Sequence, residues 1–361
     1  MTARTPARRC IEEIRSLAEK IPSPPLRLME VCGTHTVSIA RNGIRDILPE
    51  NISLLSGPGC PVCVTPDGVI DAAISLAEDP RVIIATFGDM MKVPGTEKSL
   101  ERARAEGADV RMVYSPTDAL RFAREYPDRK VVFIAVGFET TQPGNALTIE
   151  RARADGLKNF FVIPAGKLIP PAMAALLEDS DSRIGGFICP GHVSVIIGAD
   201  AYAPIVEKYG KPCVVAGFEP EEILEGIAMF LGMAVEERPE VVIQYRQCVD
   251  RAGNLRAREI LNRVYHPADS EWRGLGVIPE SGFELNDEYA DYDAFRHFGI
   301  EPRPSRERKG CRCGEVLQGK VEPFECALFS RACTPEHAVG PCMVSSEGTC
   351  GAYYRYNRKK M

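Results

Sequence analysis

The fold class is decided by residues 131–141, which read Val-Val-Phe-Ile-Ala-Val-Gly-Phe-Glu-Thr-Thr. An unbroken apolar run that ends at a glycine is typical of a strand buried on both faces, as in a parallel sheet covered by helices. On either side of this run, from Leu26 to Tyr245, short apolar runs alternate with helix-like segments. This alternation predicts an α/β fold.

Nine strands are expected in this part of the chain, with helices between them. The strand candidates are Leu26–Val31, Ile52–Ser56, Val82–Phe87, Val110–Tyr114, Val131–Val136, Phe160–Pro164, Gly186–Cys189, Pro212–Ala216 and Val241–Tyr245. The helical candidates between them are Asp67–Ala77, Leu100–Glu106, Asp118–Glu125, Asn145–Arg153 and Pro220–Leu231.

Nine strands are many for one sheet, so we expect two Rossmann-like, doubly wound α/β domains, residues 26–120 and 121–245, divided between Tyr114 and Lys130. A third, cysteine-rich iron–sulfur domain is expected at residues 246–361. It would begin with a helix, Arg251–Val264, followed by Pro267–Arg308, which shows little periodicity. Within that stretch, Glu301-Pro302-Arg303-Pro304 is a linker-like approach to the cysteine-rich tail. The N-terminal segment, residues 1–25, is expected to form an amphipathic helix that could pack on this third domain.

The composition narrows the class of protein. A net charge of −6 argues against a dedicated nucleic-acid binder, and no apolar run is long enough to span a membrane. No signal peptide precedes the first strand, so a reducing, cytoplasmic location is expected. There, clustered cysteines more often bind metal or carry out redox chemistry than form disulfides. Of the thirteen cysteines, six lie between Cys311 and Cys350.

Two cysteine motifs follow the first two strand candidates, where open α/β sheets bind ligands. Cys32 would lie at a helix N-terminus, where backbone N–H groups favour a thiolate, and His35 lies one turn further on. Alternatively, both are ordinary structural residues. Cys60 and Cys63 form a Cys-x-x-Cys in a Gly/Pro-rich loop, a spacing that suits either a metal-ligand pair or a dithiol/disulfide couple.

Two further candidates follow later strands. Glu139 comes after the apolar run at 131–136, and the threonines behind it are equally well explained as helix caps. His192, in Pro190-Gly191-His192, could be a proton shuttle or a ligand, although a lone histidine is more often structural.

The tail carries four widely spaced cysteines, Cys311, Cys326, Cys333 and Cys350, in the pattern Cys-x14-Cys-x6-Cys-x16-Cys. Cys313 could replace Cys311, and Cys342 is an extra cysteine. Four thiolates suit structural zinc or an iron–sulfur cluster, and the wide single spacings favour a [4Fe–4S] cluster, because zinc ribbons usually use close pairs.

Together these motifs resemble the HypD family of hydrogenase maturation proteins. The resemblance runs through Cys-Gly-Thr-His-Thr at 32–36, Gly-Pro-Gly-Cys-Pro-Val-Cys at 57–63, Gly-Phe-Glu-Thr-Thr at 137–141, Pro-Gly-His-Val-Ser at 190–194 and the four-cysteine tail. It covers residues 26 to 354. Five motifs in this order are highly specific.

The resemblance implies a scaffold on which the Fe(CN)2CO unit of [NiFe] hydrogenase is assembled. It implies that Cys32 shares the iron with a small HypC-type chaperone, that HypE delivers cyanide as a thiocyanate, and that Cys60 and Cys63 act as a redox-active dithiol coupled to a [4Fe–4S] cluster. The same three cysteines are thus the expected contacts of the iron, while His35, Glu139 and His192 are candidates for proton transfer. No nucleic-acid or membrane partner is expected.

Two other functions fit the same residues. The chain could be a thiol–disulfide oxidoreductase that uses Cys60 and Cys63, with the cluster as an electron relay and no iron–cyanide unit. It could also be an interaction scaffold with structural zinc in the tail.

Overall fold

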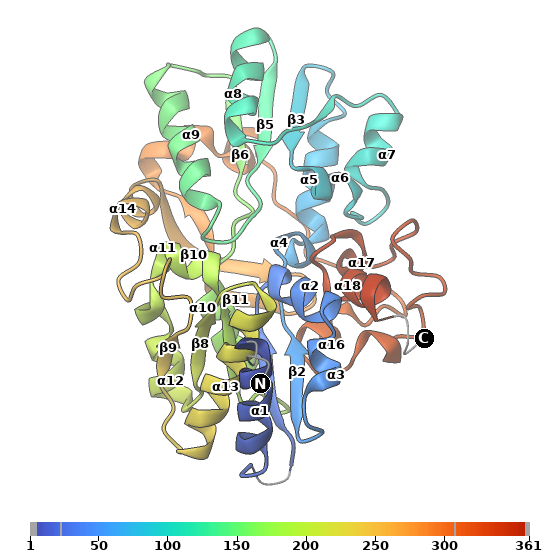
Figure 1. Ribbon diagram of the computed structural model, residues 1–361. Helices are drawn as coiled ribbons and strands as arrows, with labels where there is room; N and C mark the ends of the chain where they lie inside the picture. The colour runs from blue at the N-terminus through green and yellow to red at the C-terminus, as the bar shows by residue number, and fades with distance from the viewer. Residues whose placement is uncertain (1–5, 22–23, 307, 358–361) are drawn as a thin grey trace.

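The computed structural model describes residues 6–21, 24–306 and 308–357. Its core consists of two parallel β-sheets, each covered by helices, and an antiparallel hairpin (Figure 1). The predicted α/β class with parallel sheets is confirmed, and a strand lies at each of the nine expected positions, with ends that differ by one or two residues.

The first sheet has five parallel strands in the order β2-β1-β7-β8-β9. These are β2 (Ile52–Ser56), β1 (Leu26–Glu30), β7 (Gly186–Pro190), β8 (Cys213–Ala216) and β9 (Val241–Ile243). Alternate residues serve opposite faces: Leu28 packs towards α1 (Pro6–Ala18) and α13 (Pro220–Val235), whereas Met29 packs towards α10 (Ile169–Glu178) and the cysteine-rich tail.

The second sheet has four parallel strands in the order β4-β3-β5-β6. They are β4 (Val110–Met112), β3 (Val82–Thr86), β5 (Lys130–Ile134) and β6 (Phe160–Ile163). One face is covered by α5 (Asp67–Leu76) and α7 (Leu100–Ala105), and the other by α8 (Pro116–Glu125) and α9 (Gln142–Ala154). The apolar run quoted first is the centre of this sheet, which is why its side chains are buried on both faces.

The expected boundary between residues 120 and 121 does not divide the sheets. The chain begins in the five-stranded sheet, crosses after β2 to build the whole four-stranded sheet, and returns at β7. β4, α8 and β5 form a crossover within one sheet. All nine strands carry the same kind of apolar run, so the pattern predicts where strands lie but not which of them pair.

Two expectations about the flanking segments were wrong. The stretch with little periodicity contains most of an antiparallel hairpin, which consists of β10 (Tyr265–Trp272) and β11 (Gly276–Leu285). Its sequence is largely polar, so no apolar run indicated these strands. Trp272 packs in the core of the five-stranded sheet and Phe283 in that of the four-stranded sheet, so the hairpin joins the two. Helix α1 packs on α13 and not on the tail.

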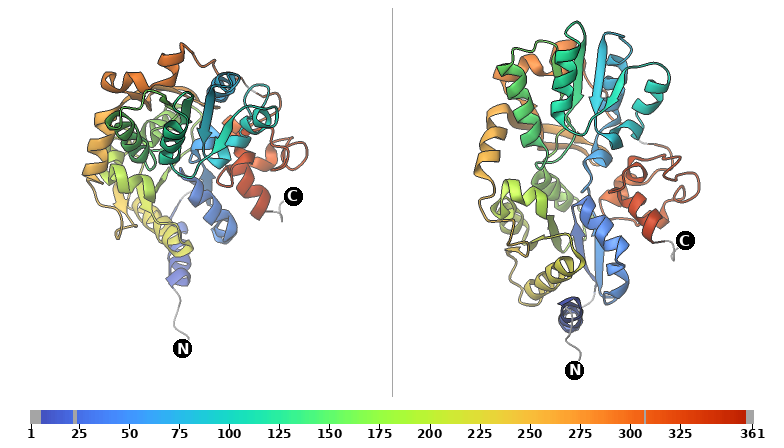
Figure 2. Two further views of the ribbon diagram at one scale, coloured as in Figure 1. Left: turned by 90° about the horizontal axis from the view of Figure 1, so that it is seen from above. Right: turned by 45° about the horizontal axis from the view of Figure 1, so that its top comes forward.

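The remaining elements complete the chain. They are α2 (Gly33–Arg41), α3 (Ile44–Ile47), α4 (Pro61–Val64), α6 (Gly88–Lys92), α11 (Gly191–Ile197), α12 (Ala203–Tyr209), α14 (Leu255–Val264), α15 (Ala294–Phe298), α16 (Cys313–Leu317), α17 (Pro341–Val344) and α18 (Thr349–Tyr356), with short 3-10 turns at Ala199–Tyr202, Asp287–Tyr292 and Pro323–Glu325. The tail lies beside α2 and α4, as Figures 1 and 2 show. Among the described residues, no helix combines the length and the apolar character that crossing a membrane would require.

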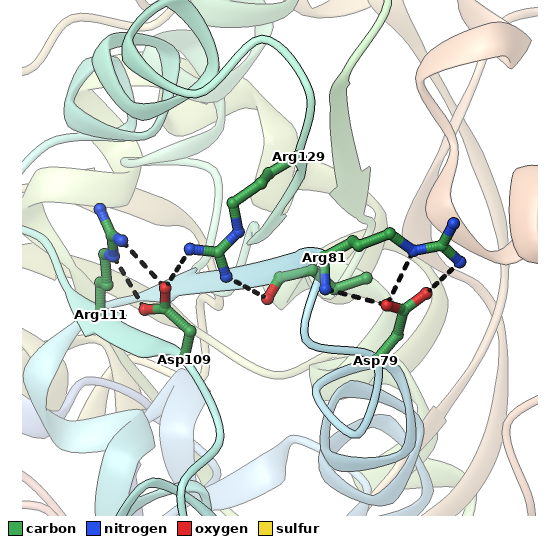
Figure 3. A network of polar contacts seen from close by, with 6 residues as sticks. Asp79, Arg81, Asp109, Arg111 and Arg129 are labelled. Atoms are coloured by element: carbon green, nitrogen blue, oxygen red, sulfur yellow. Dashed lines mark hydrogen bonds and ion pairs between the residues drawn. The ribbon is translucent and has the colours of Figure 1, made fainter.

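A network of charges ties together the amino ends of the strands in the four-stranded sheet (Figure 3). Asp109 accepts hydrogen bonds from Arg111 Nε at 2.8 Å and Arg129 Nη1 at 2.7 Å, and Arg129 Nη2 donates to the Val82 carbonyl. The hydrogen bonds from Arg111 and Arg129 lower the pKa of Asp109. Its stabilising contribution is therefore present above the unfolded pKa and is lost as the pH falls through the folded one.

Replacing Asp109 by alanine should lower the free energy of unfolding by about 1–2 kcal/mol, because two half-buried arginines lose a shared partner. Urea unfolding at neutral pH measures this. The control is Asp79→Ala, also in Figure 3, where the carboxylate pairs only with the exposed Arg81; its unfolding midpoint should stay nearly unchanged. Equal midpoints for the two variants would contradict the role given to Asp109.

Candidate functional site

The carboxyl edge of the five-stranded sheet brings together most of the side chains that the sequence singles out. β1 and β2 are neighbours, and the loops after them touch: the Gly33 N–H donates to the Gly59 carbonyl at 2.8 Å. A Cβ on Gly59 would lie 2.1 Å from the Cys32 nitrogen, so only glycine allows this approach. The chain leaves β1 towards β2 on one side and reaches β7 on the other, which makes this the switch point where open α/β sheets bind ligands.

Cys32 lies between β1 and α2, half-buried. Burial raises the pKa of its thiol to about 12, and the N–H groups of Thr34 and His35 at the helix N-terminus oppose this only in part. The expectation that the helix end alone would favour a thiolate is therefore wrong for the free protein: loss of hydration outweighs the N–H dipoles. A bound cation would reverse the balance, since a coordinating thiol is deprotonated outright.

Glu30, the last residue of β1, lies next to Cys32 and was not among the predicted site residues. The carboxylate is fully buried; it accepts hydrogen bonds from the Cys32 N–H at 3.2 Å and from Thr36 Oγ1 at 2.6 Å. Arg45 Nη2 is 3.9 Å from it. Burial raises the pKa of Glu30 to about 7. The signal that could have revealed it is a carboxylate at the end of a strand, two residues before Cys32.

The Cys60 and Cys63 thiols lie side by side, with their Sγ atoms 2.6 Å apart. Cys60 caps α4, and its Sγ accepts the Cys63 N–H at 3.3 Å. Both side chains are buried, although the motif lies in a Gly/Pro-rich loop. Burial raises the pKa of Cys63 well above its usual range, and the Cys342 thiol beside it adds to this effect.

His35 and His192 lie on either side of Phe218, which follows β8. The ring centroid of Phe218 is 5.0 Å from that of His35 and 4.2 Å from that of His192. His35 is fully buried, and its Nε2 donates to the Gly217 carbonyl at 2.8 Å. Burial lowers the pKa of His35 to about 4, so the ring is neutral. The Nε2–H group of His35 thus donates its hydrogen bond to the Gly217 carbonyl and not to the Cys32 thiol.

Glu139 follows β5 and belongs to the other sheet. Its side chain is buried; Oε1 accepts the Ile169 N–H at 2.9 Å, and Oε2 has no hydrogen-bond partner among the described residues. Burial raises the pKa of Glu139 to about 7. Its hydrogen bond to Ile169 and its electrostatic effect on Tyr202 place it between the sheets. Among described residues, no contact joins it to Cys32 or His192.

The tail thiols are Cys311, Cys313, Cys326, Cys333, Cys342 and Cys350. Cys342, in α17, is close enough to Cys313 and Cys63 for both thiols to lower its pKa. Cys313 in turn lies 3.2 Å from Cys311, sulfur to sulfur, and raises the pKa of Cys350. The extra cysteines of the sequence therefore connect the Cys60/Cys63 pair to the tail.

The donor set of the tail fits a four-cysteine cluster in its chemistry. Gly340 leaves the space: a Cβ there would meet the Cys311 and Cys313 sulfurs at 2.6 and 2.5 Å. The Val339 N–H donates to Cys333 Sγ at 3.3 Å, a contact that stabilises a thiolate. Cys326 Sγ faces the Gly310 carbonyl at 3.8 Å. Within the described ranges, however, no three Cys, His, Asp or Glu side chains are already grouped as metal ligands.

The segment between Cys342 and Cys350 packs against the first turn of α2, next to Cys32. Thr34 Oγ1 donates to Glu347 Oε1 at 2.8 Å, and Ser345 Oγ donates to Asp89 Oδ2 at 2.9 Å. A Cβ on Gly33 would lie 2.6 Å from the Glu347 Cβ, so this close packing needs the glycine. The tail, the five-stranded sheet and α6 thus meet at the site.

Comparison with known proteins identifies the family. The family model HypD, described as "Hydrogenase formation hypA family", matches residues 5–357. The chain belongs to the HypD family. It is 48% identical to hydrogenase maturation factor HypD of Azotobacter vinelandii over 353 residues, covering 96% of this chain and 93% of that protein.

Two other relatives agree. Hydrogenase maturation factor HypD of Escherichia coli (strain K12) is 47% identical, with 97% of this chain and 95% of the relative covered. A protein of Methanocaldococcus jannaschii described as "Putative hydrogenase expression/formation protein MJ0993" is 43% identical, with 97% of each chain covered. The resemblance inferred from the motifs is confirmed.

The HypD-family motifs thus fall into two groups in space. Those of Cys32, Cys60 and His192 follow β1, β2 and β7 of one sheet, and the tail reaches the same edge through Cys342 and Glu347. The motif of Glu139 follows β5 of the other sheet. Cys342 and Glu347 could have been found only from the fold, because no local spacing links them to Cys63 or Thr34.

Proposed function

We propose that this HypD-family protein is the scaffold and redox partner for assembly of the Fe(CN)2CO unit of [NiFe] hydrogenase. Its substrate iron is held by Cys32 together with a small HypC-type chaperone, and cyanide arrives from HypE. The observation that carries the proposal is the convergence of Cys32 with the Cys60/Cys63 pair at the switch point of one sheet. Low-spin ferrous iron that carries cyanide and carbonyl accepts thiolate ligands, and this edge offers three thiols.

The dithiol supplies the electrons for cyanide release. A thiocyanate R–S–CN and two thiols give R–SH, HCN and a disulfide: the S–CN bond breaks, an S–S bond forms, and both thiol protons pass to the products. Cys60 and Cys63, 2.6 Å apart, need little movement to close. The released cyanide can then bind the iron at Cys32.

Returning the disulfide to the dithiol requires two electrons from the tail. A [4Fe–4S] cluster on Cys311, Cys326, Cys333 and Cys350 would pass them on one at a time from an external one-electron donor, and two protons from solvent complete the two thiols. Cys313 and Cys342 lie between the two, since both Cys313 and Cys63 are near enough to Cys342 to lower its pKa. We infer that these two cysteines pass electrons between the tail and the pair as a second dithiol.

The second candidate function, a thiol–disulfide oxidoreductase without bound iron–cyanide, is favoured by the same line of thiols. Infrared spectra separate the two, because only the scaffold holds iron-bound cyanide and carbonyl. Metal analysis separates both from an interaction scaffold whose tail binds zinc.

Cys60 and Cys63 are expected to form a reversible disulfide. Differential alkylation of the full-length protein across a series of redox potentials should show a single two-electron transition for the pair. The matched control is Cys189 and Cys213, on the neighbouring strands β7 and β8, which are also buried and close enough for Cys213 to raise the pKa of Cys189. They lie inside the sheet core. They should stay reduced. If Cys60 and Cys63 stay reduced at every potential reached, the dithiol role is wrong.

A further inference from the structure

A cavity of about 460 Å³ lies between the turn of the β10–β11 hairpin and the cysteine-rich tail, and the proposed function gives no role to the arginines in its wall. Its described lining residues lie within 271–276, 305–306, 311–318 and 340–341, together with Arg308. The volume falls in the range of pockets that hold small molecules. The cavity is separate from the carboxyl edge of the sheet: among its lining residues are Cys311 and Cys313, but not Cys32, Cys60 or Cys63.

The lining is positively charged in a chain whose net charge is −6. Four arginines, Arg273, Arg306, Arg308 and Arg312, face two glutamates, Glu271 and Glu315. The charge of Glu315 is balanced by Arg312, with which it forms an ion pair three residues along the chain. Glu271 accepts the Ser305 N–H at 2.8 Å. The other three arginines face Glu271, and the buried Asp67 also acts on Arg273. The described lining residues thus keep an excess of positive charge.

Arg273 gives the strongest indication that the cavity holds a ligand. Only 7% of its surface is exposed, and its Nη1 donates to the Pro94 carbonyl at 3.1 Å. Its Nη2 is buried and has no hydrogen-bond partner within the described part of the chain. Arg308 repeats the pattern: it donates to the Gly95 carbonyl, while its buried Nε is unpartnered among the described residues. Unpaired buried guanidinium donors are costly, so a native protein usually supplies an acceptor.

We propose that this cavity binds a small oxyanion, a phosphate or carboxylate group whose oxygens accept from Arg273 and Arg308. Guanidinium groups match such oxygens in planar, paired geometry. The depth of Arg273 favours a small ligand over an acidic protein surface, which would reach the exposed Arg306 first. Glycines keep the cavity open: at Gly274 the φ angle is +80°, and a Cβ would lie 2.7 Å from the Gly314 Cα.

The ligand would sit against the tail thiols. Cys311 and Cys313 share the cavity wall with the arginines. Cys313 and burial raise the pKa of Cys311, and the charge of Arg273 opposes this rise. An anion here would offset the arginine charges next to these two sulfurs. The site thus offers a way for a soluble anion to influence the redox chemistry of the tail, although the binding itself does not depend on the proposed function.

Isothermal titration calorimetry with inorganic phosphate, on full-length protein purified without air, tests the proposal. Phosphate should bind with a stoichiometry of one, and Arg273→Gln should weaken binding by about tenfold to a hundredfold, the usual effect of losing a charged hydrogen bond. Arg306→Gln, on an exposed residue that cannot disturb folding, should also weaken it. Glu315→Gln should do the opposite and tighten it, since it frees Arg312. The control is Arg238→Gln, far from the cavity on a surface pair with Glu240.

Three results would overturn the proposal. The first is no phosphate binding to the unmodified protein. The second is equal affinity for Arg306→Gln and Arg238→Gln, or for Glu315→Gln and the unmodified protein. The third is binding that is seen only after iron has been removed with a chelator, which would mean that the arginines serve as counter-charge to a tail cluster and not to a free anion.

Discussion

Cys32→Ser is expected to reduce hydrogenase maturation to background in cells that make a [NiFe] hydrogenase but lack their own HypD-family protein. Serine keeps nearly the same volume at a half-buried position, so the fold should survive. The hydroxyl, however, is a poor ligand for low-spin ferrous iron compared with a thiolate. Hydrogenase activity in cell extracts measures the loss.

The control for this variant is Cys10→Ser. Cys10 lies in α1, which packs on α13 away from the carboxyl edge of the sheet. Hydrogenase activity should be close to that of the unmodified chain. His35→Ala should have an intermediate effect, since His35 contacts Gly217 and Phe218 and not the Cys32 thiol. Full activity of Cys32→Ser would exclude Cys32 as the iron ligand.

The second large effect is expected in the tail. Protein purified without air should be brown and carry about four irons in a cluster held by four cysteine thiolates, in addition to any iron at Cys32. Cys333→Ser should abolish the colour and the acid-labile sulfide, because Cys333 is a proposed ligand that already accepts the Val339 N–H.

The extra cysteines provide the controls. Cys342→Ser should keep the cluster, since Cys342 lies on the side of Cys63, yet it should slow reduction of the Cys60/Cys63 disulfide. Cys311 and Cys313 are 3.2 Å apart, so a serine at each decides which of them is the ligand. Stoichiometric zinc with no sulfide would contradict the cluster and favour a structural tail.

The strands and their chemistry could be predicted from the sequence because the signals are local. Continuous apolar runs such as Val131–Val136 depend only on burial on two faces, and Cys32 and Cys60 follow their strands directly. Pairing is not local. The sequence of β1 does not indicate that its neighbours in the sheet are β2 and β7. The predicted domain boundary at residues 120/121 therefore does not separate the two sheets, because the chain leaves the first sheet and later returns to it.

The environment of each site residue was also beyond the sequence. The helix N-terminus at Cys32 could be predicted, but burial raises the pKa of this thiol, and the charge of Glu347, from the distant tail, adds to the effect. The hairpin β10–β11 was missed because its exposed positions are polar and its few anchors, such as Trp272, are far apart. Contacts between distant segments decided each of these outcomes.

The most direct test of the scaffold function is infrared spectroscopy of the protein isolated without air in complex with its small HypC-type partner. The unmodified complex should show the stretching bands of iron-bound cyanide and carbonyl. The complex with Cys32→Ser should lack them while keeping the tail cluster, which shows that the variant is folded. Identical cyanide and carbonyl bands in the two complexes would mean that Cys32 does not hold the iron, and the assembly site placed at this edge of the sheet would be wrong.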